Sequence, residues 1–267
     1  MPTLAEATFR SSTAADRIRI GNVPIDRISF SAALDRIAAL VGGTAGGAVF
    51  TPNVDHVVTA EDDQEFRAAY LAADLCLVDG QPLVWAAALL GARLPEKISG
   101  SDLMLPLLQR AAREGWRVYL LGGAEGVAEA LSRDLPARLG VSVCGASSRR
   151  ISLRRSAEDE QVARAIAQSG AQLVLVGLGA PKQELWIHRC RPWLGPAVCV
   201  AVGASLDFLA GRVKRAPRWV SKAGLEWLFR LLQEPGRLWR RYLIKDPRFL
   251  YVLLRQLAAV RRTGPHA

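Results

Sequence analysis

Polar residues follow two short apolar segments in the first third of the chain. Thr51 and Asn53 come after residues 48–50, and Asp79 comes after residues 75–78. A carboxylate that apolar neighbours partly shield from water has a raised pKa and can act as a general base. Asp-Gly is also a common pair in tight turns, so Asp79 has two interpretations, a catalytic base and a plain turn residue.

A glycine-rich turn follows the apolar segment at residues 173–176. It contains Gly177 and Gly179 and continues through Pro181 to Lys182, with Pro181 suited to the first position of a helix. Backbone N–H groups at such a helix start can bind a phosphate. A dinucleotide-binding fingerprint would need a third glycine where this chain has Lys182, so a nucleotide fits this turn better than NAD does.

A third segment, residues 94–104, carries Lys97 close to the start of an expected helix. Ser101 or Asp102 is expected to cap that helix, which accounts for Asp102 without a catalytic role. No local structural reason accounts for Lys97, and an ammonium group in a turn can contact a phosphate. A solvated surface lysine is the alternative.

Several kinds of site are missing from the sequence. The three histidines are isolated, no HExxH spacing or Asp-x-Asp triplet is present, and the acidic residues 61–63 suit the first turn of a helix. A GxSxG serine-hydrolase elbow is absent, and the four cysteines form no CxxC pair. We therefore expect no bound metal, no disulfide framework and a reducing compartment.

Apolar segments alternate with segments of helical periodicity through most of the chain. The expected strands are residues 18–20, 48–50, 75–78, 118–121, 141–144, 173–176 and 198–202, and the expected helices are residues 31–40, 62–72, 82–90, 103–114, 126–139, 157–168 and 183–193. Strands separated by helices of this length form right-handed βαβ units. The sequence therefore predicts an α/β fold with a Rossmann-like, mostly parallel sheet flanked by helices, and functional residues where the strands end.

Positive charge is concentrated near the C-terminus. The 267 residues carry a net charge of +10, yet residues 212–262 alone hold 14 Lys or Arg against three acidic residues, so the remainder is nearly neutral. Helical periodicity in this segment is broken at Pro235 and Pro247. Trp and Tyr residues lie among the cations, which predicts two or three short amphipathic helices that lie at a membrane interface.

An ordinary helical cap with solvated Arg side chains is the alternative for this segment. Nucleic acid fits less well, because no recognised reading motif accompanies the charge. The sequence has no signal peptide and no apolar stretch of about 18 residues, so we expect any membrane contact to be from one side.

Eight short motifs run in order along the chain. They are TPN (51–53), VDGQPLVW (78–85), ISGSDL (98–103), VYLLGG (118–123), VGLGAPKQELW (176–186), VGASLDFLAG (202–211), RAPRW (215–219) and GLEWLFRLLQEPGRLWRRY (224–242). Together they resemble the WecG/TagA/CpsF family of bacterial glycosyltransferases. The resemblance implies a GT-E type fold and no cofactor. It implies inverting, metal-independent transfer of a hexose or N-acetylhexosamine-type sugar from a UDP-sugar to a polyprenyl-diphosphate-linked saccharide. The reaction would belong to cell-surface or exopolysaccharide biosynthesis, at the cytoplasmic face of the inner membrane.

The resemblance also implies a role for each matching position. The proposed base of the family falls on Asp79, and its Thr and Asn near the donor sugar fall on Thr51 and Asn53. Lys97 stands where the family often has Arg, which keeps the charge for a diphosphate contact but loses the bidentate fork. Substrate-binding positions are expected at Gly80, Gly122, Gly179, Pro181, Lys182, Gln183, Glu184 and Asp207. Cations expected at the membrane and the acceptor diphosphate are Arg215, Arg218, Arg230, Arg237, Arg240 and Arg241.

The expected organisation has three parts. Residues 1–17 form a flexible N-terminal arm, residues 18–211 the α/β glycosyltransferase domain, and residues 212–267 a basic, amphipathic appendage that docks on the membrane. The expected partners are a UDP-sugar, which is a substrate and not a cofactor, the lipid-linked acceptor and the anionic inner-membrane surface, with no nucleic acid.

Three questions stay open at the level of sequence. The donor sugar could be N-acetylmannosamine, its uronic acid or glucose. Self-association is not settled by any motif. A non-enzymatic membrane-binding module, and less favourably a nucleotide-dependent oxidoreductase, remain as alternative functions.

Overall fold

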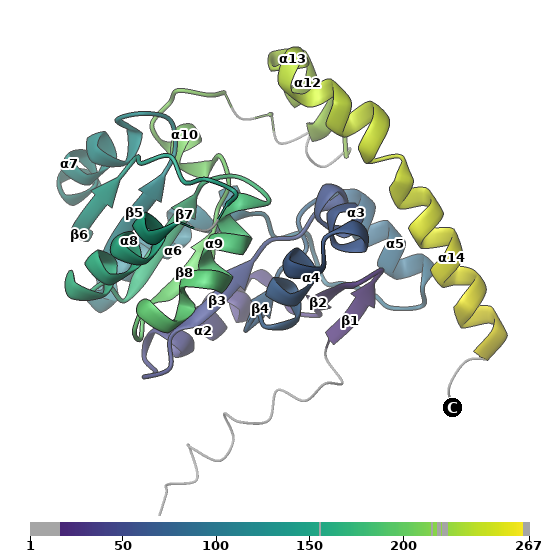
Figure 1. Ribbon diagram of the computed structural model, residues 1–267, viewed down its shortest axis with the longest axis horizontal. Helices are drawn as coiled ribbons and strands as arrows, with labels where there is room; N and C mark the ends of the chain where they lie inside the picture. Colours follow the sequence, from purple (N-terminus) through teal and green to yellow (C-terminus); the bar gives the residue numbers. More distant parts are fainter. Residues whose placement is uncertain (1–16, 155, 215, 218–219, 221–223, 264–267) are drawn as a thin grey trace, which may run out of the picture.

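The fold is built on one six-stranded sheet (Figure 1). The computed structural model describes residues 17–154, 156–214, 216–217, 220 and 224–263, so most of the expected N-terminal arm lies outside the described residues. The strands are β3 (Gly47–Phe50), β4 (Leu75–Cys76), β5 (Arg117–Gly122), β6 (Ser142–Ser147), β7 (Leu173–Gly177) and β8 (Val198–Ala201). Every neighbouring pair is parallel, in the order β4-β3-β8-β7-β5-β6, which confirms the predicted sheet.

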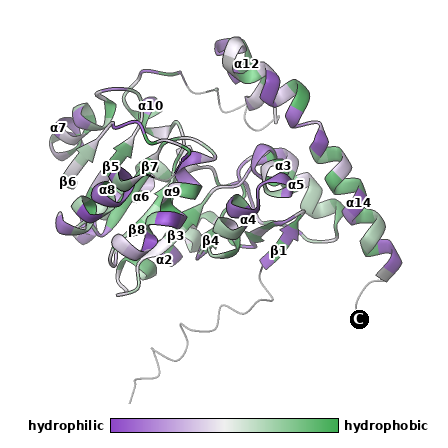
Figure 2. Cartoon of the chain, in the orientation of Figure 1, coloured by the Kyte–Doolittle hydropathy of each residue, from purple (hydrophilic) through white to green (hydrophobic). Residues whose placement is uncertain are grey.

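Helices cover both faces of this sheet, which is why its strands are almost continuously apolar (Figure 2). Along β7, Leu173 and Leu175 face one core, whereas Val174 and Val176 face the other. The first core is closed by α2 (Phe30–Val41), α6 (Gly100–Glu114) and α7 (Val127–Leu139). The second is closed by α4 (Gln64–Leu71), α8 (Ala157–Gln168) and α9 (Lys182–Cys190).

The expected strand at residues 18–20 does not join the sheet. It forms β1 (Arg17–Ile20), which pairs antiparallel with β2 (Val23–Asp26), a strand that the sequence reasoning missed. Gly21, with φ +56°, makes the tight turn between them. The Arg17 guanidinium donates two hydrogen bonds of 2.9 Å to the Asp26 carboxylate and so closes the far end of this hairpin.

Three predicted helix boundaries are wrong, each for a local reason. The expected helix at 62–72 is α4, which begins only at Gln64, because the Asp63 carboxylate caps it by accepting a hydrogen bond from Phe66 N–H. Asp62 ends a preceding helix that was not predicted, α3 (Val54–Asp62). Ser99, and not Ser101 or Asp102, is the N-cap of α6. The expected helix at 183–193 ends as α9 and continues as the short 3-10 turn η2 (Arg191–Trp193), where Pro192 lacks a backbone N–H.

The two remaining helices of the α/β body lie next to strand ends. α5 (Gln81–Leu89) begins directly after Asp79 and Gly80, and α10 (Ser205–Leu209) follows β8. Gly100, in the first turn of α6, lets that helix approach β8 closely, because a Cβ at this position would lie 3.0 Å from Val202 Cα.

The basic C-terminal segment forms α12 (Glu226–Gln233), α13 (Pro235–Trp239), the π-helical turn η3 (Arg240–Lys245) and α14 (Arg248–Thr263). The predicted breaks at Pro235 and Pro247 are confirmed. In Figure 1 this yellow segment runs as a bent rod beside α3 and α5. Among the described residues, no helix combines the length and the apolar character that crossing a bilayer would require.

α14 is docked on the α/β body by packing and by polar contacts. Val252 and Leu253 are buried in the core that also contains Ile20. The Gln256 side chain accepts a hydrogen bond from Gly21 N–H at 2.8 Å and donates one to the Arg19 carbonyl at 2.7 Å. The appendage is therefore part of the folded body over this region.

The carboxyl ends of β5 and β7 come together at two glycines. A Cβ on Gly122 would lie 2.6 Å from the Gly177 carbonyl oxygen, and Gly122 has φ +100°. Both the contact and the backbone conformation therefore require glycine at position 122.

We expect Gly122→Ala to lower the free energy of unfolding by about 3 kcal/mol, because it adds a backbone clash to the strain of a positive φ. Gly126→Ala is the matched control: Gly126 also has a positive φ, of +76°, but nothing lies within 4 Å of a Cβ placed there. It should cost only about 1 kcal/mol. Thermal unfolding followed by circular dichroism measures both, and equal losses in the two variants would contradict the close approach at Gly122.

Candidate functional site

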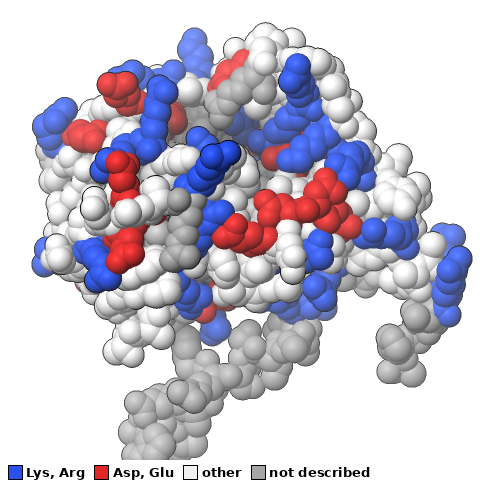
Figure 3. All heavy atoms as spheres, in the orientation of Figure 1, with Lys and Arg blue, Asp and Glu red and all other residues white. Residues whose placement is uncertain are grey.

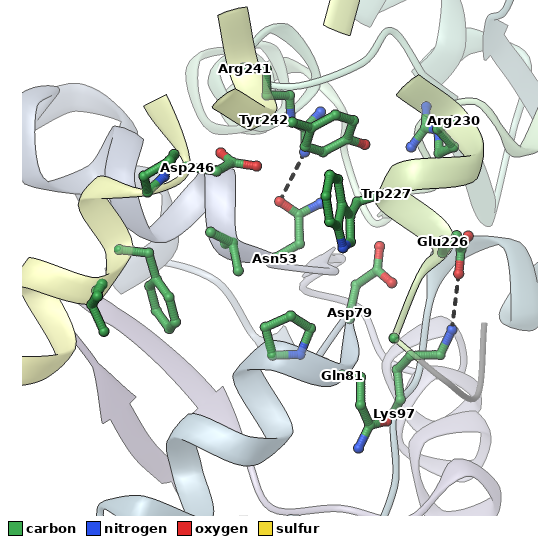
Figure 4. Close-up of a pocket in the computed structure, with 17 residues that line it drawn as sticks. Asn53, Asp79, Gln81, Lys97, Glu226, Trp227, Arg230, Arg241, Tyr242 and Asp246 are labelled. Atoms are coloured by element: carbon green, nitrogen blue, oxygen red, sulfur yellow. Dashed lines mark hydrogen bonds and ion pairs between the residues drawn. The ribbon is translucent and has the colours of Figure 1, made fainter. Parts of the chain in front are cut away.

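A pocket of about 390 Å³ lies where the ends of β3 and β4 meet the appendage (Figure 4). Three loops of the α/β body form its floor and are joined by backbone hydrogen bonds. Asp79 N–H donates to the Pro52 carbonyl at 2.8 Å, and Ile98 N–H donates to the Val78 carbonyl at 2.7 Å. These bonds bring together three predicted site residues that are distant in sequence, Asn53, Asp79 and Lys97.

Asp79 has the electrostatic setting of a general base. It is only partly exposed, and burial, with a further contribution from the negative charge of Glu226, raises its pKa to about 7, while Lys97 acts in the opposite direction. Gly80 follows with φ +102° and precedes the first turn of α5, so the turn interpretation of the Asp-Gly pair also holds. A carboxylate whose pKa lies near neutrality can both accept a proton and be regenerated at neutral pH.

Lys97 is held between carboxylates. Its Nζ lies 3.4 Å from Glu226 Oε2 and 3.8 Å from Asp102 Oδ2. Asp102 belongs to the capping box of α6, whereas Glu226 opens α12 of the appendage. The lysine on the pocket wall thus also ties the appendage to the α/β body.

Asn53 is held from the other side by Arg241. The Arg241 guanidinium donates a hydrogen bond of 3.1 Å to Asn53 Oδ1, and its Nε lies 3.4 Å from Asp55 Oδ2. Lys245 Nζ lies 2.7 Å from Asp55 Oδ1. Burial disfavours the charge on Asp55, but Arg241, His56 and Lys245 outweigh it and lower the pKa of this carboxyl.

The π-helical turn η3 carries several of these contacts within one short segment. It contains an i→i+5 hydrogen bond of 2.8 Å from Asp246 N–H to the Arg241 carbonyl. Arg241 and Lys245 are four residues apart, about one helical turn, and both reach Asp55, while Tyr242 and Asp246 line the pocket.

Several pocket residues were not predicted as site residues. The appendage contributes Glu226, Trp227, Tyr242 and Asp246 to the wall, in addition to the predicted Arg230. The rings of Trp227 and Tyr242 lie 5.9 Å apart, and burial raises the pKa of Asp246 to about 6. Glu226, Trp227 and Tyr242 lie within the motif at residues 224–242, but neither the motif nor its amphipathic pattern says what that helix face covers.

Other predicted residues lie outside this pocket. Thr51 is buried and donates a hydrogen bond of 3.3 Å to the Ala201 carbonyl, which fastens the end of β3 to the end of β8. Asp207 Oδ1 accepts a hydrogen bond of 2.8 Å from Ala124 N–H and so ties α10 to the loop after β5. Gln183 and Glu184 are buried at the start of α9. Gly122, Gly179, Pro181 and Lys182 lie at the carboxyl ends of β5 and β7.

Only some of the cations predicted in the appendage line the pocket. Arg230 and Arg241 line the pocket, but Arg240 is exposed, with its guanidinium 5.4 Å from the centre of the Trp239 ring. Arg215, Arg218 and the side chain of Arg237 lie outside the described residues. Figure 3 shows Lys and Arg side chains spread along the C-terminal segment, beside acidic residues of the α/β body. Two ion pairs join this segment to the acidic residues of α3: Arg248–Asp62 and Arg255–Glu61.

The glycine-rich ends of β5, β7 and β8 form a second part of the candidate site. Gly123 N–H donates to the Gly177 carbonyl at 2.8 Å, so the loops after β5 and β7 are adjacent. At Gly179 and Gly203 nothing lies within 4 Å of the position that a Cβ would take. Backbone groups at this edge of the sheet are thus not covered by a side chain of their own residue, which suits close approach of a phosphate.

We expect the Asp79 carboxyl to titrate with a pKa near 7. Glu226→Gln should lower that pKa, because it removes a negative charge that disfavours ionisation of Asp79. Carboxyl ¹³C chemical shifts of the aspartate side chains, followed between about pH 4 and pH 9, measure both values. Glu158→Gln, at an exposed position on α8, is the control and should leave the titration unchanged. An Asp79 pKa near the ordinary value of about 4 would contradict the proposed electrostatic setting.

Comparisons with known proteins agree with this arrangement. The model of the glycosyl transferase WecG/TagA/CpsF family matches residues 18–263. The chain is 34% identical, over 225 residues, to an N-acetylglucosaminyldiphosphoundecaprenol N-acetyl-beta-D-mannosaminyltransferase of Bacillus spizizenii, an alignment that covers 83% of each protein. The family match extends over the α/β body and through the described appendage, and the relative aligns with most of the chain. The resemblance inferred from the motifs is therefore confirmed: this chain belongs to the WecG/TagA/CpsF family of glycosyltransferases.

Proposed function

We propose that this protein transfers an N-acetylmannosamine-type sugar from a UDP-sugar to N-acetylglucosamine linked to a polyprenyl diphosphate, with inversion and without a metal ion. The observation that carries the proposal is Asp79, whose pKa burial raises to about 7 in a pocket closed by the basic appendage. The activity for which the Bacillus spizizenii relative is named supports this choice of donor and acceptor.

In the proposed reaction Asp79 removes the proton from the acceptor hydroxyl as that oxygen attacks the anomeric carbon. The new C–O bond forms on the face opposite UDP, the bond to the UDP oxygen breaks, and the proton remains on Asp79 until solvent takes it. Asn53 lies next to this base. Its Oδ1 accepts hydrogen bonds from Arg241 and from Asp55 N–H, so the amide NH₂ is the group left to donate to a sugar, and in Figure 4 it points toward Trp227.

We assign the donor nucleotide to the glycine-rich edge at the ends of β5, β7 and β8. The start of α9, with Lys182, lies at this edge, and the Gly179 and Gly203 backbones can approach a diphosphate closely. Fixed N–H groups and cations can stabilise the negative charge that develops on departing UDP without a metal ion. Lys97 is a weaker candidate for this task, because Glu226 and Asp102 already neutralise part of its charge.

We assign the lipid-linked acceptor to the appendage side of the pocket. Pro247, Phe249 and Leu250 give this wall an apolar character, opposite Asp79 and Lys97. The same segment exposes Leu232, Trp239, Leu243, Ile244, Leu250, Tyr251 and Leu254. Apolar side chains interspersed with Arg suit a surface that lies in the headgroup region of an anionic membrane, so we propose a peripheral position on the cytoplasmic face.

The central test is release of UDP in detergent, with EDTA present, from a panel of UDP-sugars and a synthetic prenyl-diphosphate-linked N-acetylglucosamine. We expect turnover with UDP-N-acetylmannosamine and a loss of about two orders of magnitude or more in Asp79→Asn, because the general base is removed. Asp134→Asn is the matched control on an exposed face of α7 and should keep full activity.

Two results would count against this proposal. Equal activity of Asp79→Asn and Asp134→Asn would remove Asp79 from the mechanism. No turnover with any donor, together with tight binding of the intact protein to anionic vesicles, would favour the alternative of a non-enzymatic membrane-binding module.

The apolar wall generates a separate prediction. We expect Leu250→Ser to raise the KM for a prenyl-linked acceptor by about three- to tenfold, because less apolar surface is buried against the lipid. The KM for an acceptor with a methyl group in place of the prenyl chain should not change. Leu71→Ser, at an exposed position on α4 outside the pocket and outside the apolar set of the appendage, is the control and should leave both KM values unchanged. Equal effects of Leu250→Ser on the two acceptors would contradict an apolar wall that contacts the lipid.

A further inference from the structure

Beneath the pocket, a chain of buried side chains joins the two parts of the site. We propose that Glu184 is a positioning residue that orients Asn53 through His56 and Gly203 through Gln183, so that the acceptor side and the donor side keep a fixed relation. This inference rests on the proposed function for the meaning of the two sides, but the contacts themselves do not depend on it.

The first arm runs from Glu184 to Asn53. Asn53 N–H donates a hydrogen bond of 2.9 Å to His56 Nδ1, as part of the capping box of α3. Because Nδ1 accepts this bond, the proton of the neutral imidazole must be on Nε2. Nε2 lies 3.8 Å from Glu184 Oε1, beyond hydrogen-bond distance, and it has no hydrogen-bond partner among the described residues. The side chains of His56 and Glu184 are only 5% and 0% exposed, so this N–H and this carboxylate oxygen face each other without intervening solvent. Burial lowers the pKa of His56 to about 3, so the ring stays neutral.

The second arm runs from Glu184 to Gly203. Gln183 Nε2 donates a hydrogen bond of 2.8 Å to the same Glu184 Oε1. This bond orients the Gln183 amide so that its Oε1 accepts a hydrogen bond of 3.1 Å from Gly203 N–H. Gly203 lies in the turn between β8 and α10, at the glycine-rich edge, and Asn53 lies on the pocket wall. Glu184 Oε1 therefore faces two N–H groups, that of His56, which contacts Asn53, and that of Gln183, which contacts Gly203.

Stability alone is a poor reason for a carboxyl group at this position. Glu184 is completely buried, its Oε2 has no hydrogen-bond partner among the described residues, and burial raises its pKa to about 7. An apolar side chain of similar size would avoid this desolvation. A group that is costly to bury, and that both accepts a hydrogen bond from Gln183 and faces the His56 ring, fits a role in alignment.

The test compares kcat, the KM for each substrate and the thermal midpoint of a set of variants. His56→Leu and Glu184→Met, which removes the acceptor oxygen, should each lower kcat by about tenfold or more, with little change in the thermal midpoint, because the pocket residue is displaced while the fold is kept. His56→Gln should retain kcat within about threefold. Its side chain can still accept from Asn53 N–H in the capping box and donate to Glu184.

Two further variants sharpen the test. The double variant His56→Leu/Glu184→Met should be no slower than the slower single variant, because both act through one path. Tyr70→Phe is the matched control. Tyr70 is buried with its ring 6.1 Å from that of His56, and its hydroxyl has no hydrogen-bond partner among the described residues, so kcat should not change.

The inference is overturned if the variants lower only the thermal midpoint, if the two single effects add, or if His56→Gln is as slow as His56→Leu. It can also fail without any activity measurement. ¹⁵N chemical shifts of the histidines should give neutral, Nε2-protonated His56 from about pH 5 to pH 8, and a protonated ring or the other tautomer would contradict the first arm. An inactive wild-type protein with the expected His56 tautomer would instead count against the proposed function.

Discussion

The buried contact of Asp55 with Arg241 and Lys245 is the interaction on which the pocket depends. Asp55 is 7% exposed, and it lies at the start of α3, directly behind Asn53. A buried carboxylate is tolerated only when cations compensate its desolvation, and here both cations come from one π-helical turn of the appendage. The same contact therefore compensates the charge and fastens the appendage over the ends of β3 and β4.

Closure of the pocket has an electrostatic consequence for Asp79. The strand ends alone would leave this carboxylate at an open sheet edge, where water would keep its pKa near the ordinary value. With Trp227, Tyr242 and Glu226 opposite it, burial and a nearby negative charge raise the pKa to about 7. The chemistry available at the α/β body thus depends on a segment that is about 150 residues away in the chain.

The two parts of the candidate site use different kinds of chemical group. At the ends of β3 and β4 the side chains of Asn53 and Asp79 are presented, whereas at the ends of β5, β7 and β8 glycines expose the backbone. A parallel sheet explains why both lie on one side of the molecule, because all its strands end at the same edge. The buried side chains of His56, Gln183 and Glu184 lie between the two parts.

Much of the fold could be predicted because its strands are buried on both faces. Such strands form uninterrupted apolar segments, and six of the seven predicted segments are strands of this sheet. The seventh, residues 18–20, is a strand of the separate hairpin. The elements that were not predicted are short or polar. β2 has four residues and contains Pro24 and Asp26. α3 begins directly after the TPN motif, and its N-cap, Asn53, was interpreted only as a site residue. Capping depends on which backbone groups lack partners, and helical periodicity alone does not give that.

The family, the parallel sheet and the residue types at its strand ends could all be inferred from the sequence, because they follow from local apolar patterns and from motifs along the chain. Which cations reach the pocket depends instead on the tertiary structure. Arg240 and Arg241 are adjacent and chemically identical, yet one contacts the Trp239 ring in solvent and the other contacts Asn53 and Asp55. Successive residues of a helix point in different directions, and the contact that a side chain makes depends on a surface that a distant part of the chain supplies.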